Sequence, residues 1–152
     1  QKDRPDDALS QFLNRVLAKE LQPWHKRFSD EFYEQLYRLR GYSKNMRGRP
    51  MDLAKITADL VYSRLGPEVL ESLRTRNPCN TFGQRENKHH QWLNPDGQML
   101  LKRHLDNMIL LMKAAPSWDF FMVMFNRACP PINPQLPFEY TVEDFELTGA
   151  TI

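Results

Sequence analysis

The chain has 152 residues, of which 41% are apolar and 26% are charged. These proportions are typical of one globular domain with a substantial core, and they exclude a disordered or fibrous chain. No apolar run approaches the roughly 20 residues that cross a bilayer, and no segment has the pattern of an export signal, so we expect a cytoplasmic protein without a membrane partner. Because the chain begins with Gln1 and not with Met, we expect further residues upstream.

Charge is divided unevenly along the sequence. Residues 1–127 contain all 21 Lys and Arg residues and 15 acidic residues, whereas residues 128–152 contain four acidic residues and no Lys or Arg. The body of the chain is therefore mildly basic and its end is acidic. This balance permits an anionic partner without requiring one, because exposed Lys and Arg are common on solvated helix faces.

Apolar residues at helical spacing predict helices in the first part of the chain at residues 9–21, 30–40, 53–65 and 67–76. Pro23 stops the first predicted helix. Ser29 caps the second helix, which ends at Gly41. Residues 41–50 have turn chemistry and are predicted to form a loop, and Pro67 can open the fourth helix.

Two further helices are predicted in the second part of the chain. Residues 94–96, Asn-Pro-Asp, supply a cap, a proline at the first helical position and an early acid, and they open the longest and most apolar helix, which we expect at the centre of the core. Ser117 caps a last helix that ends at Cys129. The predicted fold is all-α, a single compact domain of about six helices over residues 6–129. Residues 130–152 are predicted to be an extended, proline-containing acidic tail with room for one short strand.

The segment RENKHHQWLNPDG, residues 85–97, holds two adjacent histidines in a chain with only four. A metal site needs three or four converging ligands, whereas neighbouring side chains diverge by about 100° on a helix and about 180° on a strand. Third ligands could come from His104, Cys79, Asp96 or Glu86, but none of these stands at a recognised metal spacing. We therefore predict a structural role for the pair, with no metal and no other cofactor.

The structural role that we predict is a staple that fixes the start of the long helix. His90 and Trp92 are predicted to be buried against that helix, because a buried tryptophan contributes far more than an exposed histidine does to binding. Lys88 and His89 are predicted to face outward beside Arg85.

Catalytic constellations are not evident in the sequence. His104 falls on the apolar stripe of the long helix, where a core histidine with one hydrogen bond is expected. Cys79 has basic neighbours but no nucleophile elbow or orienting partner, and no glycine-rich phosphate loop is present. Cys79 and Cys129 are expected to be reduced thiols, and a disulfide between them is the alternative in an oxidising compartment. No catalytic residue is predicted.

Two clusters of basic residues lie mostly in predicted loops, where Arg and Lys can reach phosphates and an exposed ring can stack on a base. The first cluster consists of Arg38, Arg40, Lys44, Arg47 and Arg49. The second cluster consists of Arg74, Arg76, Arg85, Lys88 and His89, and it runs through His90 into Trp92. We expect both clusters to contact nucleic acid, and the alternative is a solvated rim around an ordinary core.

Four segments taken together resemble the p-sixty-three C-terminal domain family of phage and phage-derived bacterial proteins. They are LAKELQPWHKRFSDEFYEQLYRLRG (17–41), ADLVYSRLGPEVLESLRTRNP (58–78), KHHQWL (88–93) and LLKRHLDNMILLMKAAPSWDFFMVMFNRACP (100–130), and the resemblance covers about residues 9–130. It implies a separate N-terminal module, similar to those of regulators that bind DNA. It implies no enzymatic activity.

The residues and the resemblance leave three hypotheses. The first is a non-enzymatic module of a phage-type DNA-binding or transcription-regulatory protein, which contacts nucleic acid through the basic loops and can self-associate. The second is a domain for protein interaction or oligomerisation alone, with DNA bound only by the N-terminal module. The third is a metal-dependent hydrolase built on His89, His90 and His104.

Overall fold

The computed structural model describes residues 5–43 and 52–132, with side chains from residue 8 onward. Its α-helices are α1 (Pro5–Val16), α2 (Asp30–Arg40), α3 (Leu53–Ile56), α4 (Val69–Arg76), α5 (Pro95–Ala114) and α6 (Trp118–Ala128). Shorter helical turns are η1 (Thr57–Val61), η2 (Tyr62–Arg64) and η3 (His89–Trp92). The described residues contain no β-strand, which confirms the predicted all-α fold. The predicted acidic tail and its short strand fall on residues 133–152, outside the described residues.

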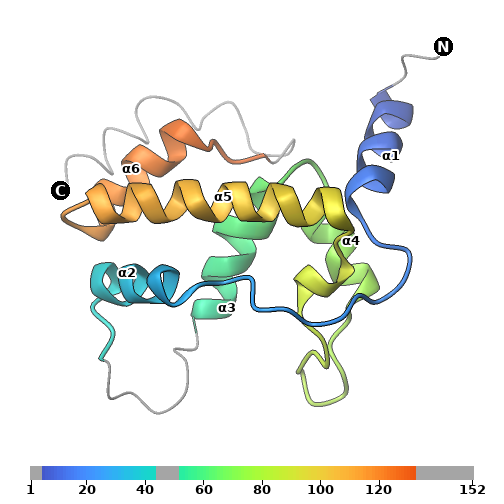
Figure 1. Cartoon of the computed structure of the whole chain (residues 1–152), viewed down its shortest axis with the longest axis horizontal. Helices are drawn as coiled ribbons and strands as arrows, with labels where there is room; N and C mark the ends of the chain where they lie inside the picture. Colours follow the sequence, from blue (N-terminus) through green and yellow to red (C-terminus); the bar gives the residue numbers. More distant parts are fainter. Residues whose placement is uncertain (1–4, 44–51, 133–152) are drawn as a thin grey trace.

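Helix α5 is the centre of the core, as its apolar sequence predicts. It runs along the length of the molecule in Figure 1, with α6 along one side and α2 along the other. Four of its apolar side chains are buried, namely Leu101, Leu105, Met108 and Met112. None of the described helices is long and apolar enough to span a membrane.

The starts of three helices follow from local capping signals. The Oγ atom of Ser29 accepts the backbone N–H of Phe32 at 3.2 Å at the start of α2. Asn94 caps α5 in the same way, because its Oδ1 atom accepts the N–H of Gly97 at 3.0 Å. Ser117 caps α6 through the N–H of Phe120. A side-chain acceptor at each start satisfies an N–H group that the helix itself cannot pair.

The first helix is shorter than its apolar spacing predicts, because α1 ends at Val16 and not near Leu21. Residues 17–22 leave the helix and run beside η3: the Ala18 N–H donates to the carbonyl of Trp92 at 2.9 Å, and the Gln22 N–H donates to the carbonyl of Gln91 at 2.8 Å. These contacts supply the backbone hydrogen bonds that another helical turn would have made. Leu21 is consequently exposed.

The predicted helix over residues 53–65 is continuous but irregular. It consists of α3, the π-helical turn η1 and the 3₁₀ turn η2. The carbonyl of Leu60 in η1 accepts a hydrogen bond from Nε2 of His104 at 2.7 Å, so His104 is buried on α5 with one backbone partner. The next helix, α4, begins at Val69 and not at Pro67, because Glu68 adopts a left-handed backbone conformation with φ of 60°.

Candidate nucleic-acid interface

The turn η3 is held by hydrogen bonds along both of its sides. Within the turn, the Lys88 N–H donates to Oε1 of Gln91 at 2.9 Å, and the Gln91 N–H donates to the carbonyl of Lys88 at 3.0 Å. Nε2 of Gln98, in the first turns of α5, donates to the carbonyls of His90 and Leu93. The two histidines therefore occupy a well-defined turn between residues 17–22 and α5.

His89 is partly buried, so the prediction that its ring faces outward is wrong. Its ring meets the ring of Tyr62 edge-on, with 5.2 Å between centroids. The amide nitrogen of Asn77, which can only donate, lies 3.2 Å from Nδ1 of His89, so Nδ1 accepts. Burial, and then the charges of Arg85 and Arg74, lower the pKa of His89 to about 4.

His90 is buried, as predicted, with 4% of its surface exposed. Its ring lies near that of Phe28, with 6.4 Å between centroids. Burial, and then the charges of Arg27, Lys88 and His25, lower the pKa of His90 to about 4. Both histidines are therefore neutral at pH 7.

The other half of the predicted staple, Trp92, is partly buried and packs against the hydrophobic core. The backbone carbonyl of Trp92 accepts the N–H of Ala18, which ties the staple to the segment after α1. The staple therefore holds residues 17–22 as well as the start of α5.

Basic side chains from three separate segments gather around η3, and we call them the η3 patch. The patch consists of His25, Arg27, Arg74, Arg85 and Lys88. Arg74 comes from α4, Arg85 and Lys88 from the connection before η3, and His25 and Arg27 from the extended segment before α2. Across the described residues, no member of the patch forms an ion pair with a carboxylate. Their positive charge is therefore directed at the surroundings of the turn and not neutralised locally.

Two members of the η3 patch were missed by the sequence analysis. His25 and Arg27 lie in residues 21–29, which contain no acidic residue. That run resembles the basic segments that were singled out, but it was assigned to the helix and its end. The fold brings it to η3 only because residues 17–22 are extended.

Three arginines of the predicted clusters have structural partners in place of the expected phosphate contacts. The guanidinium of Arg38 donates to the last carbonyls of α5, at 2.7 Å to Met112 and 3.1 Å to Ala115. Arg40 pairs with Asp52 at 2.8 Å and lies over the Trp118 ring. These contacts join α2 to α5, α6 and the start of α3. Lys44, Arg47 and Arg49 lie outside the described residues.

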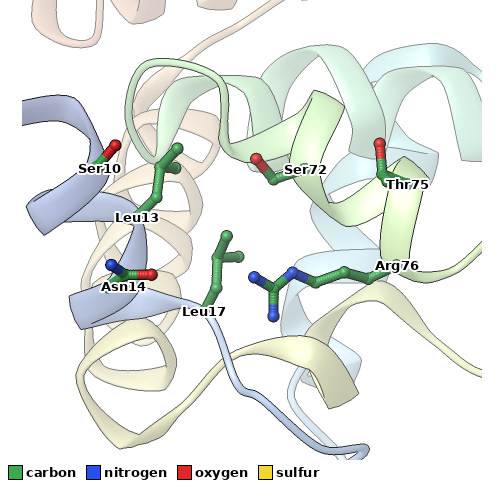
Figure 2. A pocket seen from close by; sticks show the side chains of 7 residues that line it. All are labelled: Ser10, Leu13, Asn14, Leu17, Ser72, Thr75 and Arg76. Atoms are coloured by element: carbon green, nitrogen blue, oxygen red, sulfur yellow. The ribbon is translucent and has the colours of Figure 1, made fainter. Parts of the chain in front are cut away.

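The third arginine, Arg76, lines a pocket of about 310 Å³ between α1 and α4 (Figure 2). Its guanidinium reaches toward Leu17 and donates to the carbonyl of Ala18. Arg74 and Arg76 are two positions apart on α4, so their side chains diverge by about 200°. The second predicted cluster is therefore divided between the η3 patch and this pocket. The pocket walls are otherwise formed by Ser10, Leu13, Asn14, Leu17, Ser72 and Thr75.

The histidines do not form the coordination sphere that a metal-dependent hydrolase requires. His89 contacts Asn77 and Tyr62, whereas His104 donates to a carbonyl of η1. Among residues 5–43 and 52–132, no three His, Cys, Asp or Glu side chains lie close enough to hold one ion. Cys79 and Cys129 are both free, as expected.

The fold and the η3 patch define a small all-helical domain with a cationic turn at one end of its central helix. The model of the p-sixty-three C-terminal domain family matches residues 12–101, which is more than half of the chain, and the chain belongs to this family. The match confirms the resemblance seen in the sequence, although it stops within α5 and does not extend to residue 130. No curated protein and no solved structure matches the chain.

Proposed function

We propose that this domain is a non-enzymatic module of a phage-type DNA-binding or transcription-regulatory protein, and that it contacts nucleic acid through the η3 patch. The observation that carries the proposal is the convergence of basic side chains from three segments on one turn without an ion-paired carboxylate. Unpaired Arg and Lys around one turn are suited to phosphate oxygens, which such residues bind by charge and hydrogen bonding.

The charge available at pH 7 comes from Arg27, Arg74, Arg85 and Lys88. His89 and His90 are neutral there, since their pKa values are lowered to about 4. Their contribution is to hold the turn in place, and we do not assign His89 a phosphate contact. Arg85 uses one guanidinium nitrogen on the carbonyl of Asn77, which orients the side chain and leaves its other donors for a ligand.

A salt titration tests the proposal. The chain is titrated into a fluorescently labelled DNA oligonucleotide at several salt concentrations, and anisotropy reports the affinity. Each phosphate contact contributes about 0.9 to the slope of log affinity against log salt for duplex DNA. The double variant Arg74→Ala/Lys88→Ala should therefore lower the slope by roughly 2 and weaken binding at every salt concentration.

The matched control is Lys55→Ala/Arg127→Ala, which removes the same charge from exposed positions on α3 and α6. Its slope should change by much less than that of the patch variant. Failure of the unmodified chain to bind DNA at low salt refutes the proposal. Equal losses in the two double variants would mean that only net charge matters and that the η3 patch is not a site.

Self-association is a second candidate function, favoured by the exposed face of α5. Met99 and Leu110 are each 66% exposed and lie eleven positions apart, which is close to three helical turns and so on one face. If copies of the chain pair through this face, light scattering should give a multiple of the 18.0 kDa monomer mass. Leu110→Lys should then return it to the monomer, and a monomer mass for the unmodified chain at high concentration excludes this function.

A further inference from the structure

We infer that the η3 patch binds single-stranded nucleic acid, with unpaired bases stacked on the exposed rings of Trp24 and Phe82. The inference rests on the proposed function, because it assigns a class of ligand to the same patch. It starts from a coincidence of position: two exposed aromatic side chains lie on the two segments that carry most of the patch's positive charge.

Trp24 is 58% exposed and is fixed at the edge of the patch by its chain neighbours. Two residues before it, Gln22 exchanges hydrogen bonds with Gln91 of η3, at 2.8 Å from its own N–H and at 3.1 Å to its carbonyl. Next in the chain are His25 and Arg27, whose charges act on His90. The indole ring is therefore held beside the cations on a segment anchored to η3.

Phe82 is 85% exposed at the tip of a hydrogen-bonded turn. Oδ1 of Asn80 accepts the N–H of Phe82 at 2.9 Å and the N–H of Gln84 at 3.0 Å. Gly83 completes the turn with φ of 75°, a conformation that favours glycine. Arg85 follows directly and is itself anchored to a backbone carbonyl. The ring is thus displayed by an ordered turn next to a patch cation.

The exposed apolar side chains are not scattered evenly over the described surface. Seven large hydrophobic residues are exposed there, and three of them lie on the segments that border η3: Leu21, Trp24 and Phe82. Isolated exposed hydrophobic residues are ordinary, but an aromatic ring beside unpaired cations has the composition of a single-strand binding surface. A duplex buries the faces of its bases in its own stack, so these rings can serve only a strand whose bases are unpaired.

Anisotropy titrations with two ligands test the inference. The ligands are an oligothymidylate of about 12 nucleotides, within the range of known single-strand site sizes, and a duplex of the same length. Trp24→Ala and Phe82→Ala should each weaken oligothymidylate binding by about tenfold, the order expected for one stacked base. Both variants should leave duplex affinity within about twofold, and Trp24→Phe should retain most of the single-strand affinity.

Phe120→Ala is the matched control, because Phe120 is also an exposed aromatic residue but lies on α6. It should leave both affinities unchanged, and circular dichroism should show that all variants keep the helical fold. If the two ring variants bind oligothymidylate as the unmodified chain does, stacking is refuted while salt-dependent binding through the cations still stands. No binding of either DNA at low salt refutes both proposals. Competition by polyglutamate as strong as that by oligothymidylate would show a charge-only surface and would also overturn the inference.

Discussion

Acidification should destabilise the domain through its two adjacent histidines. The pKa of His89 and that of His90 are lowered to about 4 in the folded state, mainly by burial. In the unfolded chain both should return to about 6.5. Below pH 6.5 the unfolded state therefore binds more protons than the folded state, and the free energy of unfolding falls as the pH drops from about 6.5 toward 4.

The size of the effect follows from the two pKa values. A histidine with a pKa of about 4 when folded and about 6.5 when unfolded loses about 2 kcal/mol of stabilisation between about pH 7 and about pH 5. For both histidines together the loss is roughly 4 kcal/mol, a large part of the 5–15 kcal/mol that typically separates a folded domain from its unfolded chain. Acidic residues titrate mostly at lower pH and add to the loss below that range.

Urea denaturation at the two pH values measures this loss, with the double variant His89→Gln/His90→Gln as the control. The variant is expected to be less stable at pH 7 but to lose much less on acidification, because its amides do not titrate. Imidazole NMR titrations should place both folded-state pKa values well below 6. An unchanged pH dependence in the double variant, or imidazole pKa values near 6.5, would show that burial does not keep these rings neutral.

Three substitutions test contacts of the fold, each measured by denaturant unfolding. Arg38→Ala should cost about 1–3 kcal/mol by removing charged hydrogen bonds to the last carbonyls of α5, whereas Lys102→Ala, at an exposed ion pair on the same helix, should cost less than about 0.5 kcal/mol; similar losses would contradict the capping role. Gly97→Ala should destabilise by at least about 1–3 kcal/mol, because an added Cβ would collide with the carbonyl oxygen of Val16; a neutral effect would show that α5 can move away from the end of α1. Trp92→Ala should cost about 3 kcal/mol and lower Tm by many degrees, and a loss under about 1 kcal/mol would remove the staple role of its ring.

Helix type and most helix starts could be predicted from the sequence because their causes are local. Ser29, Asn94 and Ser117 each accept an N–H only three residues ahead, so a short window contains both partners. The apolar stripe of α5 likewise needs no distant residue to be recognised, and it predicted both the central helix and the burial of His104. The family resemblance was also carried by short segments that can be read in order.

Features that depend on residues far apart in the chain were decided only by the tertiary structure. Helix α1 ends at Val16 because residues 17–22 find hydrogen-bond partners in η3, some 70 positions away, and no local signal reports that competition. The same pairing brings His25 and Arg27 beside the basic residues of α4 and of the connection before η3. Positive charge in the sequence showed how many cations were available, whereas the fold determined which remain for a ligand. Arg38 is bound to the end of α5, because a guanidinium near unpaired helix carbonyls is more stable there than in water alone.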